Sequence, residues 1–298
     1  MIDLSICTVS WNVKKLLKEC IESVWSNTKN ILFEMTVVDN NSSDDSVQMV
    51  QKEFPQVKLI RNNTNAGFTK ASNQAIKISI GRYIILLNSD TKVVNNALGV
   101  MVKFMDSHPD CGALGCKLLF PDGSLQRSCK TFPTLWSLFL NTIFLDQLFP
   151  KSKFFGKHFM TWWDHNDVRE VDQPMGSALM IRKDVLDAVG LLDENILFWY
   201  DEVDLCYRIK KAGWKIYFTP DAQIIHHLSQ GFKQWKSLKQ VIKGAIVWRK
   251  SRNYFFGKHH GKLSVMFLWF LDILQAAYIF GFLYLVVCFV IFAINKIF

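Results

Sequence analysis

The chain has 298 residues, a length that is enough for one large domain with an appendage, and half of its residues are hydrophobic. Its net charge of +9 is local, because nine of the 35 Lys and Arg residues and no acid lie between 228 and 262, and the remaining 26 balance the 26 Asp and Glu residues. Charge confined to one segment argues against nucleic-acid binding, and seven scattered cysteines without a CxxC pair favour reduced thiols over a disulfide framework or a zinc site.

The first 120 residues alternate between two hydrophobic periodicities. Short, nearly continuous apolar runs predict strands at 4–9, 34–39, 57–61 and 82–88. Apolar residues at helical spacing predict helices at 13–26, 44–54 and 69–79. This alternation predicts a parallel sheet covered on both faces, and such sheets bind ligands at the carboxyl ends of their strands.

Polar loops follow all four predicted strands, with the sequences "SWN", "NNSSDDS", "NNTNAGF" and "SDT". None of them is a glycine-rich dinucleotide or P-loop motif. Turn chemistry by itself accounts for any one of these loops. Four of them at one sheet edge predict a site for a polar ligand.

The second half changes character along the chain. The stretch 121–170 is rich in aromatic residues and broken by proline, which favours an amphipathic surface helix, a lid or core packing. The sequence "MGSALMIRKDVLDAVG" then predicts a strand and a helix. "DEVDLCYRIKKAG" predicts a helix closed by Gly213, and "WKIYFTP" predicts a further strand.

The C-terminus carries an uncharged stretch, 273–294, that is long enough to cross about 30 Å of hydrocarbon as a helix. We expect a single C-terminal span there, with a span plus an interfacial segment, or a buried helix, as the alternatives. The basic, amphipathic segment 233–262 predicts contact with anionic membrane lipid. Positive charge before a span predicts a cytoplasmic main domain at the inner (plasma) membrane.

Three carboxylates lie within four positions, directly after an aromatic run: Asp201, Glu202 and Asp204 follow "FWY" at 198–200. In a helix, Asp204 pairs with Arg208 at i+4, which leaves the other two acids for a site beside the aromatic run. An apolar wall and a neighbouring carboxylate both raise a carboxyl pKa, which suits a general base. The alternative is an acidic helix start that meets the positive end of the helix dipole.

Five ordered motifs, "VVDNNSSDDS", "NTNAGFTKASNQAI", "LLNSDT", "MGSALMIR" and "DEVDLCYRIKKAGW", resemble the family 2 glycosyltransferases. The resemblance covers about 2–232 and is closest to the bacterial branch that includes rhamnosyltransferases and other polysaccharide-assembly enzymes. It implies a GT-A fold, a nucleotide-diphosphate sugar donor, Mg²⁺ or Mn²⁺, and inversion at the anomeric carbon. Two departures stand out: Asn88-Ser89-Asp90 replaces the usual Asp-x-Asp, and Asp201-Glu202 replaces Glu-Asp.

The resemblance also assigns roles to residues. Glu202 is expected to be the base, with Asp201 orienting it or the acceptor. The nucleotide-sugar is expected to contact Ser10, Asn12, Asp39, Asn41, Asn65, Gly67, Asn73, Ser89 and Asp90. The acceptor is expected near Gly176, Trp199 and Tyr200, and the metal ion at Asp90 and His226. The alternatives are a helix N-cap for Asp90 and a core histidine for His226 or His227.

We therefore expect an α/β GT-A fold, with a Rossmann-like, mostly parallel sheet and a C-terminal transmembrane helix. The expected parts are a catalytic domain at 1–232, divided into a donor half, 1–120, and an acceptor half, 121–232, then a basic segment at 233–262 and a membrane segment at 263–298. The expected activity is sugar transfer to a lipid-linked saccharide. A non-catalytic membrane-anchored scaffold and a nucleotidyltransferase are the alternatives.

Overall fold

The computed structural model describes residues 1–227 and 237–295, with side chains throughout except at Leu238 and 279–295. The chain divides into two compact units. Unit 1 consists of Met1–Phe132 and Trp163–Arg252, and unit 2 consists of Pro133–Trp162 and Asn253–Phe298. The expected domain boundaries after 120, 232 and 262 stay predictions.

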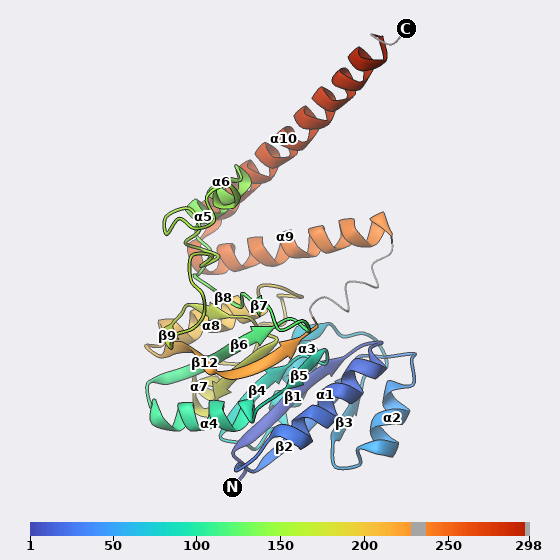
Figure 1. The fold of residues 1–298 in the computed structure, drawn as a ribbon, viewed down its shortest axis with the longest axis vertical. Coiled ribbons are helices and arrows are strands. Elements are labelled where there is room, and N and C mark those ends of the chain that lie inside the picture. The colour runs from blue at the N-terminus through green and yellow to red at the C-terminus, as the bar shows by residue number, and fades with distance from the viewer. Residues whose placement is uncertain (228–236, 296–298) are drawn as a thin grey trace. The chain divides into compact units, whose positions relative to one another are not determined.

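Unit 1 is built on a sheet of ten described strands in the order β3-β2-β1-β4-β11-β6-β12-β5, with β7 beside β6 and β9 beside β12 (Figure 1). These strands are β1 (Leu4–Ser10), β2 (Phe33–Asp39), β3 (Lys58–Arg61), β4 (Tyr83–Leu87), β5 (Thr91–Val93), β6 (Cys111–Leu119), β7 (Leu125–Gln126), β9 (Arg169–Glu170), β11 (Ala178–Arg182) and β12 (Lys215–His226). A separate pair joins β8 (Cys129–Lys130) to β10 (Gln173–Pro174).

The four strands predicted in the first 120 residues are confirmed, and so is their direction. Strand β1 pairs in parallel with β2 and β4, and β2 pairs in parallel with β3. The rest of the sheet is mixed, because β11 runs antiparallel between β4 and β6, and β5 runs antiparallel to β12. The ends of β1, β2, β3 and β4 therefore meet at one edge, as the site prediction requires.

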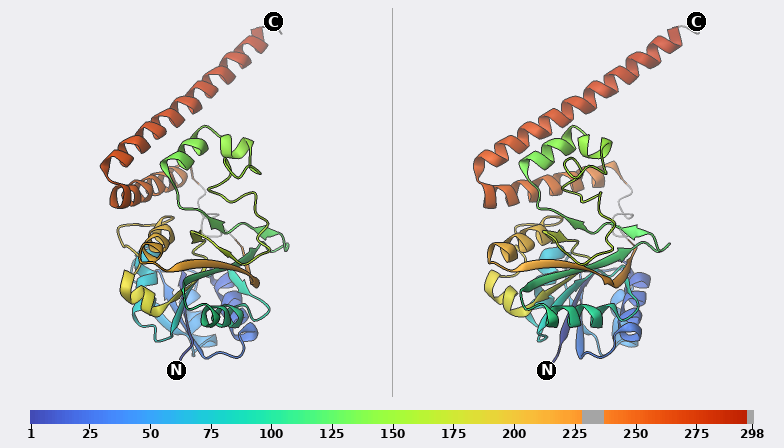
Figure 2. Two further views of the ribbon diagram at one scale, coloured as in Figure 1. Left: turned by 90° about the vertical axis from the view of Figure 1, so that its left-hand side faces the viewer. Right: turned by 60° about the vertical axis from the view of Figure 1, so that its left-hand side comes forward.

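Helices cover both faces of this sheet (Figure 2). They are α1 (Lys14–Asn27), α2 (Ser46–Glu53), α3 (Phe68–Lys77), α4 (Ala97–Ser107), α7 (Lys183–Val189) and α8 (Asp201–Lys211), and unit 1 also contains the first part of α9 (Leu238–His260). Strand β4 shows how the two faces fill: Tyr83, Ile85 and Leu87 join the core with α1 and α4, whereas Ile84 and Leu86 are buried on the other face. The period of two explains why β4 reads as a continuous apolar run.

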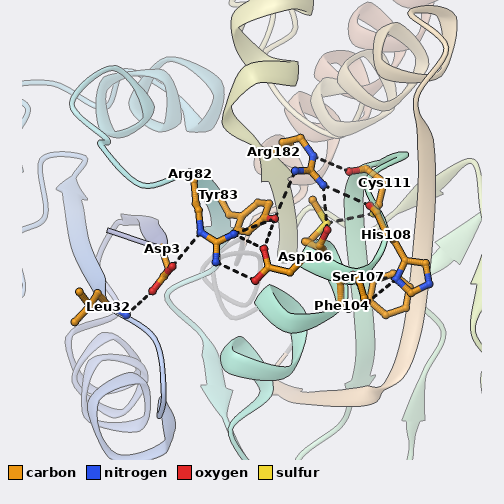
Figure 3. A network of polar contacts seen from close by, with 11 residues as sticks. Asp3, Leu32, Arg82, Tyr83, Phe104, Asp106, Ser107, His108, Cys111 and Arg182 are labelled. Carbon is orange, nitrogen blue, oxygen red and sulfur yellow. Dashed lines mark hydrogen bonds and ion pairs between the residues drawn. The ribbon is translucent and has the colours of Figure 1, made fainter. Parts of the chain in front are cut away.

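A polar network closes the edge where the parallel strands begin (Figure 3). Arg82 donates to Asp3 Oδ1 and to Asp106 Oδ2, each at 2.9 Å, and this guanidinium holds the pKa of Asp106 below its usual range. Arg182, at the end of β11, donates to the Met105 carbonyl at 3.0 Å. That carbonyl lies in the last turn of α4, where carbonyls lack helical partners. The network thus ties helix to sheet at the edge opposite the polar loops.

Unit 2 contains α5 (Leu135–Thr142), α6 (Leu145–Leu148), the end of α9 and α10 (Lys262–Asn295). Helix α5 begins with a capping box, in which Thr134 and Ser137 each accept the other's backbone N–H group. Helix α5 packs against α10. The aromatic stretch 121–170 therefore contributes two short helices to unit 2, and its outer parts belong to unit 1.

The predicted C-terminal transmembrane helix is wrong for the part of the chain that the structure describes. There, no helix combines the length and the apolar character needed to cross a bilayer. The predicted location at the inner membrane, with a cytoplasmic catalytic domain behind a single span, is corrected with it.

The six cysteines whose side chains are described are all free and buried. Burial raises the pKa of the Cys7 thiol to about 12. These thiols pack as small apolar groups. The basic segment 233–262 falls partly outside the described residues, which resume at 237.

Candidate active site

The ends of β1 and β2 bring Ser10 and Asp39 side by side, because the two residues are paired in the parallel register. Asp39 Oδ2 accepts a hydrogen bond from Ser42 N at 2.9 Å. Asp39 Oδ1 and Ser10 Oγ are buried without a hydrogen-bond partner among the described residues. Buried polar atoms are normally paired, so this strand edge presents groups that a polar ligand can satisfy.

The loops after β1 and β2 are bonded to each other. Asn12 Oδ1 accepts from Ser43 N at 2.7 Å, and Asn12 N donates to Ser42 Oγ at 3.0 Å. Asn12 and Asn41 have φ angles of 52° and 66°, which asparagine adopts more readily than most residues. These asparagines therefore shape the rim around Asp39.

The Gly67 loop is held by side-chain amides. Asn65 Oδ1 accepts from Gly67 N at 3.0 Å, and Asn40 Nδ2 donates to Gly67 O at 3.1 Å. Gly67 has a φ of +82°, a conformation that a residue with a Cβ rarely adopts. Asn73, one turn into α3, instead donates to Leu192 O at 2.9 Å. Asn73 thus ties α3 to the loop that leads to Asp201, and its contact with the donor stays a prediction.

Asp90 faces a histidine from a distant strand. Asp90 Oδ1 lies 3.3 Å from His226 Nε2, at the end of β12, and His226 Nδ1 lies 2.7 Å from Gln126 Oε1. Gln126 Nε2 points at the His226 carbonyl at 3.5 Å, which fixes the orientation of the amide. Helix α4 begins at Ala97 with Asn96 as its N-cap, so the N-cap alternative for Asp90 is wrong. His226 is buried and faces a carboxylate, and its role as a metal ligand or a core histidine stays a prediction.

This pair fits a divalent cation. His226 Nδ1 lies against Gln126 Oε1, and Nε2 faces Asp90 Oδ1. An imidazole nitrogen and a carboxylate oxygen placed this close can both ligate one divalent cation. Within the described residues, no group of three or more His, Cys, Asp or Glu side chains has the arrangement of a metal site. A cation held here would therefore need further ligands from phosphate or water, as Mg²⁺ normally does.

The acid pair lies at the start of α8. Arg208 Nε donates to Asp204 Oδ2 at 2.8 Å, which confirms the predicted i+4 pair and leaves Asp201 and Glu202 to the site. Asp201 is buried, with 4% of its surface exposed, and burial raises its pKa to about 6. Burial first, and then the charge of Asp201, raise the pKa of Glu202 well above its usual range. The hydrogen bond between the two carboxyls further raises the pKa of Glu202 and lowers that of Asp201.

Gly176 lies between the acid pair and the segment that carries Asp90. A Cβ on Gly176 would lie 3.4 Å from Glu202 Cβ, so this glycine packs directly on Glu202. The carbonyl of the next residue, Ser177, accepts from Asn88 N at 2.9 Å, two residues before Asp90. The segments that carry Asp90 and Glu202 are therefore joined through two consecutive residues.

The aromatic run before α8 is strained and packed. Trp199 has a φ of 73°, a costly conformation for a bulky residue, and such strain clusters at functional sites. The centroid of the Phe198 ring lies 4.6 Å from that of Trp199 and 6.1 Å from that of Phe68, which is next to Gly67. Tyr200 is buried, and its ring centroid lies 6.3 Å from that of Trp248 of α9. The run thereby places the acid pair beside the Gly67 loop.

Residues 5–164, more than half of the chain, match the model of the family described as Glycosyl transferase family 2. The chain belongs to glycosyl transferase family 2. The resemblance found in the sequence motifs is thereby confirmed.

Among family 2 relatives, the chain is 26% identical over 202 residues to the N-acetylglucosaminyl-diphospho-decaprenol L-rhamnosyltransferase of Mycobacterium tuberculosis, covering 64% of this chain and 65% of the relative. The chain thus spans slightly less than two thirds of that protein. Two crystal structures share the fold at 17% identity. The first is GalNAc-T7 with UDP, GalNAc and Mn²⁺, with a TM-score of 0.56, and the match covers 76% of this chain and 44% of that one. The second is S. aureus TarS 1–349, with a TM-score of 0.53, and the match covers 86% of this chain and 72% of that one. They support a GT-A-like fold.

One residue of this candidate site escaped the sequence interpretation. Gln126, which orients His226, lies on the two-residue strand β7. Its partner lies 100 positions further along the chain, so no local periodicity reveals it. The one available signal was its position in the irregular stretch 121–170.

Proposed function

We propose that this protein transfers a sugar from a nucleotide-diphosphate donor to a saccharide hydroxyl, with inversion at the anomeric carbon. The observation that carries the proposal is the link from Glu202 through Gly176 and Ser177 to Asn88 and Asp90. It sets a proton acceptor and a candidate cation ligand on adjoining segments, which a displacement with an attacking hydroxyl and a charged leaving group requires.

Glu202 is the proposed base. As the acceptor oxygen bonds to the anomeric carbon, the bond from that carbon to the diphosphate oxygen breaks, and the hydroxyl proton passes to Glu202. Burial and the charge of Asp201 raise the Glu202 pKa above its usual range, and a more basic carboxylate accepts the hydroxyl proton more readily. Asp201 is hydrogen-bonded to the Glu202 carboxyl and orients it. Attack from the side opposite the leaving group inverts the configuration.

The donor is proposed to bind across the strand ends. Asp39 Oδ1 and Ser10 Oγ are suited to the base and ribose, and the Gly67 loop encloses them. Asp90 and His226 would hold Mg²⁺ or Mn²⁺, which neutralises the charge of the departing diphosphate. The family 2 match and the Mn²⁺ and UDP of GalNAc-T7 support this part of the proposal.

The acceptor is proposed to be a lipid-linked saccharide, and the transfer to be rhamnosyltransferase-like. The mycobacterial relative supports both points, since its name specifies a diphospho-decaprenol acceptor and rhamnose. Unit 2 supplies an apolar groove of about 410 Å³, lined by Thr134, Leu135, Phe256, His260, Leu263, Ser264 and Phe267. Large apolar side chains are exposed next to it, including Leu263 at 79% and Met266 at 59%.

The charges around this groove match an anionic lipid. No Asp or Glu occurs from 253 to 271, whereas Lys258 and Lys262 lie in that range. An exposed apolar patch bordered by cations is typical of a surface that binds an amphiphile with an anionic head group. We propose that the prenyl chain occupies the groove and that the lysines meet its diphosphate.

The decisive experiment is a transfer assay with a panel of dTDP-, UDP- and GDP-sugars, a synthetic diphosphopolyprenyl saccharide, and Mg²⁺ or Mn²⁺. The Glu202→Gln variant should lose at least about 100-fold in kcat, the contribution expected of a general base. Glu22→Gln on α1, whose side chain is 52% exposed, is the matched control and should transfer at the parental rate. Full activity of Glu202→Gln would end the base assignment, and inactivity of the parent on every donor would favour the scaffold alternative.

A further inference from the structure

The loop between α7 and α8, residues 190–200, leads directly into the acid pair, and side chains of α3 hold it by its backbone. Thr69 Oγ1 donates a hydrogen bond to the Ile196 carbonyl at 2.6 Å. Asn73 binds the backbone of Leu192 twice: Nδ2 donates to the carbonyl at 2.9 Å, and Oδ1 accepts from the N–H group at 3.1 Å. Because Thr69 and Asn73 lie four positions apart in the helix, they share one face, and that face meets the loop.

These contacts are buried. Thr69 and Asn73 are each 2% exposed, and Leu192 and Ile196 are buried as well. A buried carbonyl left without a donor costs free energy, because water does not replace the lost hydrogen bond. The two side chains therefore fix the loop more firmly than hydrogen bonds at the surface would.

The same helix is also fastened to the edge of the sheet that is proposed to bind the donor. The amides of Gln74 and Asn62 exchange hydrogen bonds at 3.0 Å, and Asn62 Nδ2 also donates to Asn40 Oδ1 at 3.0 Å. Asn40 in turn donates to the carbonyl of Gly67, directly before α3. Asn62 follows β3 and Asn40 follows β2. Helix α3 thus joins the strand ends to the loop that precedes the acid pair.

The end of this loop is strained. Trp199 has a φ of 73°, and a strained residue persists only where its surroundings fix the chain around it. Thr69 fixes Ile196 three positions before Trp199, and α8 begins at Asp201 two positions after it. Release of Ile196 would let Trp199 relax, and the start of α8 would move and take Glu202 with it.

We propose that Thr69 and Asn73 are positioning residues for the transfer reaction: their hydrogen bonds to the 190–200 loop hold the acid pair in the place, relative to the donor edge, that transfer requires. The proposal rests on the function proposed above. Both side chains act through the backbone of the loop, so their loss should lower kcat and leave donor binding unchanged. A misplacement of about 1 Å can cost about 100-fold in rate.

The test is the steady-state kinetics of the transfer assay, with the full chain and a series of threonine variants. Thr69→Val keeps the shape of the side chain and removes its hydroxyl, so kcat should fall at least about tenfold while the donor KM stays within about twofold of the parent. Thr69→Ser keeps the hydroxyl and should retain kcat within about threefold. The matched control is Thr28→Val at the end of α1, because Thr28 is also buried but its hydroxyl has no hydrogen-bond partner among the described residues. This control should leave both constants unchanged.

Hydrogen exchange supplies a readout that does not depend on activity. The backbone amides of 191–200 should exchange about threefold to tenfold faster in Thr69→Val than in the parent, and at the parental rate in Thr69→Ser. Asn73→Ala serves as a second variant if Thr69→Val does not fold, and the same fall in kcat and the same faster exchange are expected. Unchanged exchange in the folded variants would show that these side chains do not hold the loop, and would overturn the proposal.

The kinetic outcomes separate the rival roles. A lower Tm with the parental kcat would overturn the proposal in favour of a purely structural role, and a higher donor KM with the parental kcat would overturn it in favour of direct donor contact. The Glu202→Gln variant distinguishes a failure of this proposal from a failure of the proposed function. If Glu202→Gln is inactive while Thr69→Val keeps the parental kcat, only the positioning role fails. If Glu202→Gln is fully active, the proposed function fails, and the positioning role fails with it.

Discussion

Asp201 should make the native state less stable as the pH rises, and its removal should reverse this loss. Burial raises its pKa from 3.8 to about 6, so the folded protein holds this proton more tightly than the unfolded chain. The stabilisation is complete below about pH 4 and is lost as the pH rises through about 6. At 1.36 kcal/mol per pKa unit, this one carboxyl makes the free energy of unfolding about 3 kcal/mol lower at pH 8 than at low pH.

The Asp201→Asn variant, which keeps the shape but not the charge, should therefore gain up to about 3 kcal/mol at pH 8 and little at pH 4.5. A chain of 298 residues unfolds with an entropy of about 0.6 kcal/mol/K, so the gain corresponds to an increase in Tm of about 5 °C. Scanning calorimetry of parent and variant at the two pH values measures the difference directly.

The matched control is Asp187→Asn on α7, where the side chain is 65% exposed. Its effect on Tm should be the same at both pH values. The reasoning is refuted if Asp201→Asn changes Tm equally at pH 4.5 and pH 8, or if it lowers Tm more at pH 8 than at pH 4.5. Either result would mean that burial does not destabilise the ionised form of Asp201 in the folded protein.

Three further predictions follow from other parts of the molecule. Asp90→Ala should abolish the Mn²⁺-dependent part of nucleotide binding, measured by calorimetry with and without EDTA. Arg182→Met should lower the free energy of unfolding by about 2 kcal/mol, because the charged hydrogen bond to the α4 carbonyl is lost. Phe267→Glu in the unit 2 groove should raise KM for a prenyl-linked acceptor but not for a short soluble analogue, whereas Ile80→Glu, exposed in unit 1, should change neither.

Each of these has a clear contrary result. Equal nucleotide affinity of parent and Asp90→Ala in Mn²⁺ would remove Asp90 from the cation site. An unchanged urea midpoint for Arg182→Met would show that water replaces the guanidinium at α4 without cost. A parallel rise in KM for both acceptors, in the Phe267→Glu variant, would place the defect in the fold of unit 2 and not in recognition of the prenyl chain.

The sequence by itself determined the elements of the first 120 residues and the motif set. Strands β1, β2 and β4 are buried on both faces along most of their length, so each appears as a nearly continuous apolar run, and the helices between them keep one apolar stripe. The Asp204–Arg208 pair was also predictable, because i+4 contacts on a helix depend only on local geometry. The C-terminal span shows the limit of the same approach, since hydropathy over 273–294 predicted a helix across the bilayer that the described residues do not support.

Only the tertiary structure decided which distant residues complete the site. The antiparallel direction of β11, the contact of Gln126 with His226, and the packing of Gly176 on Glu202 all join positions many residues apart. A short strand such as β7 carries too few residues to show a period, so its partner is set by packing and not by local pattern. The surroundings of the acid pair depend on burial and proximity in three dimensions, so the sequence showed the two carboxylates but not the residues packed around them.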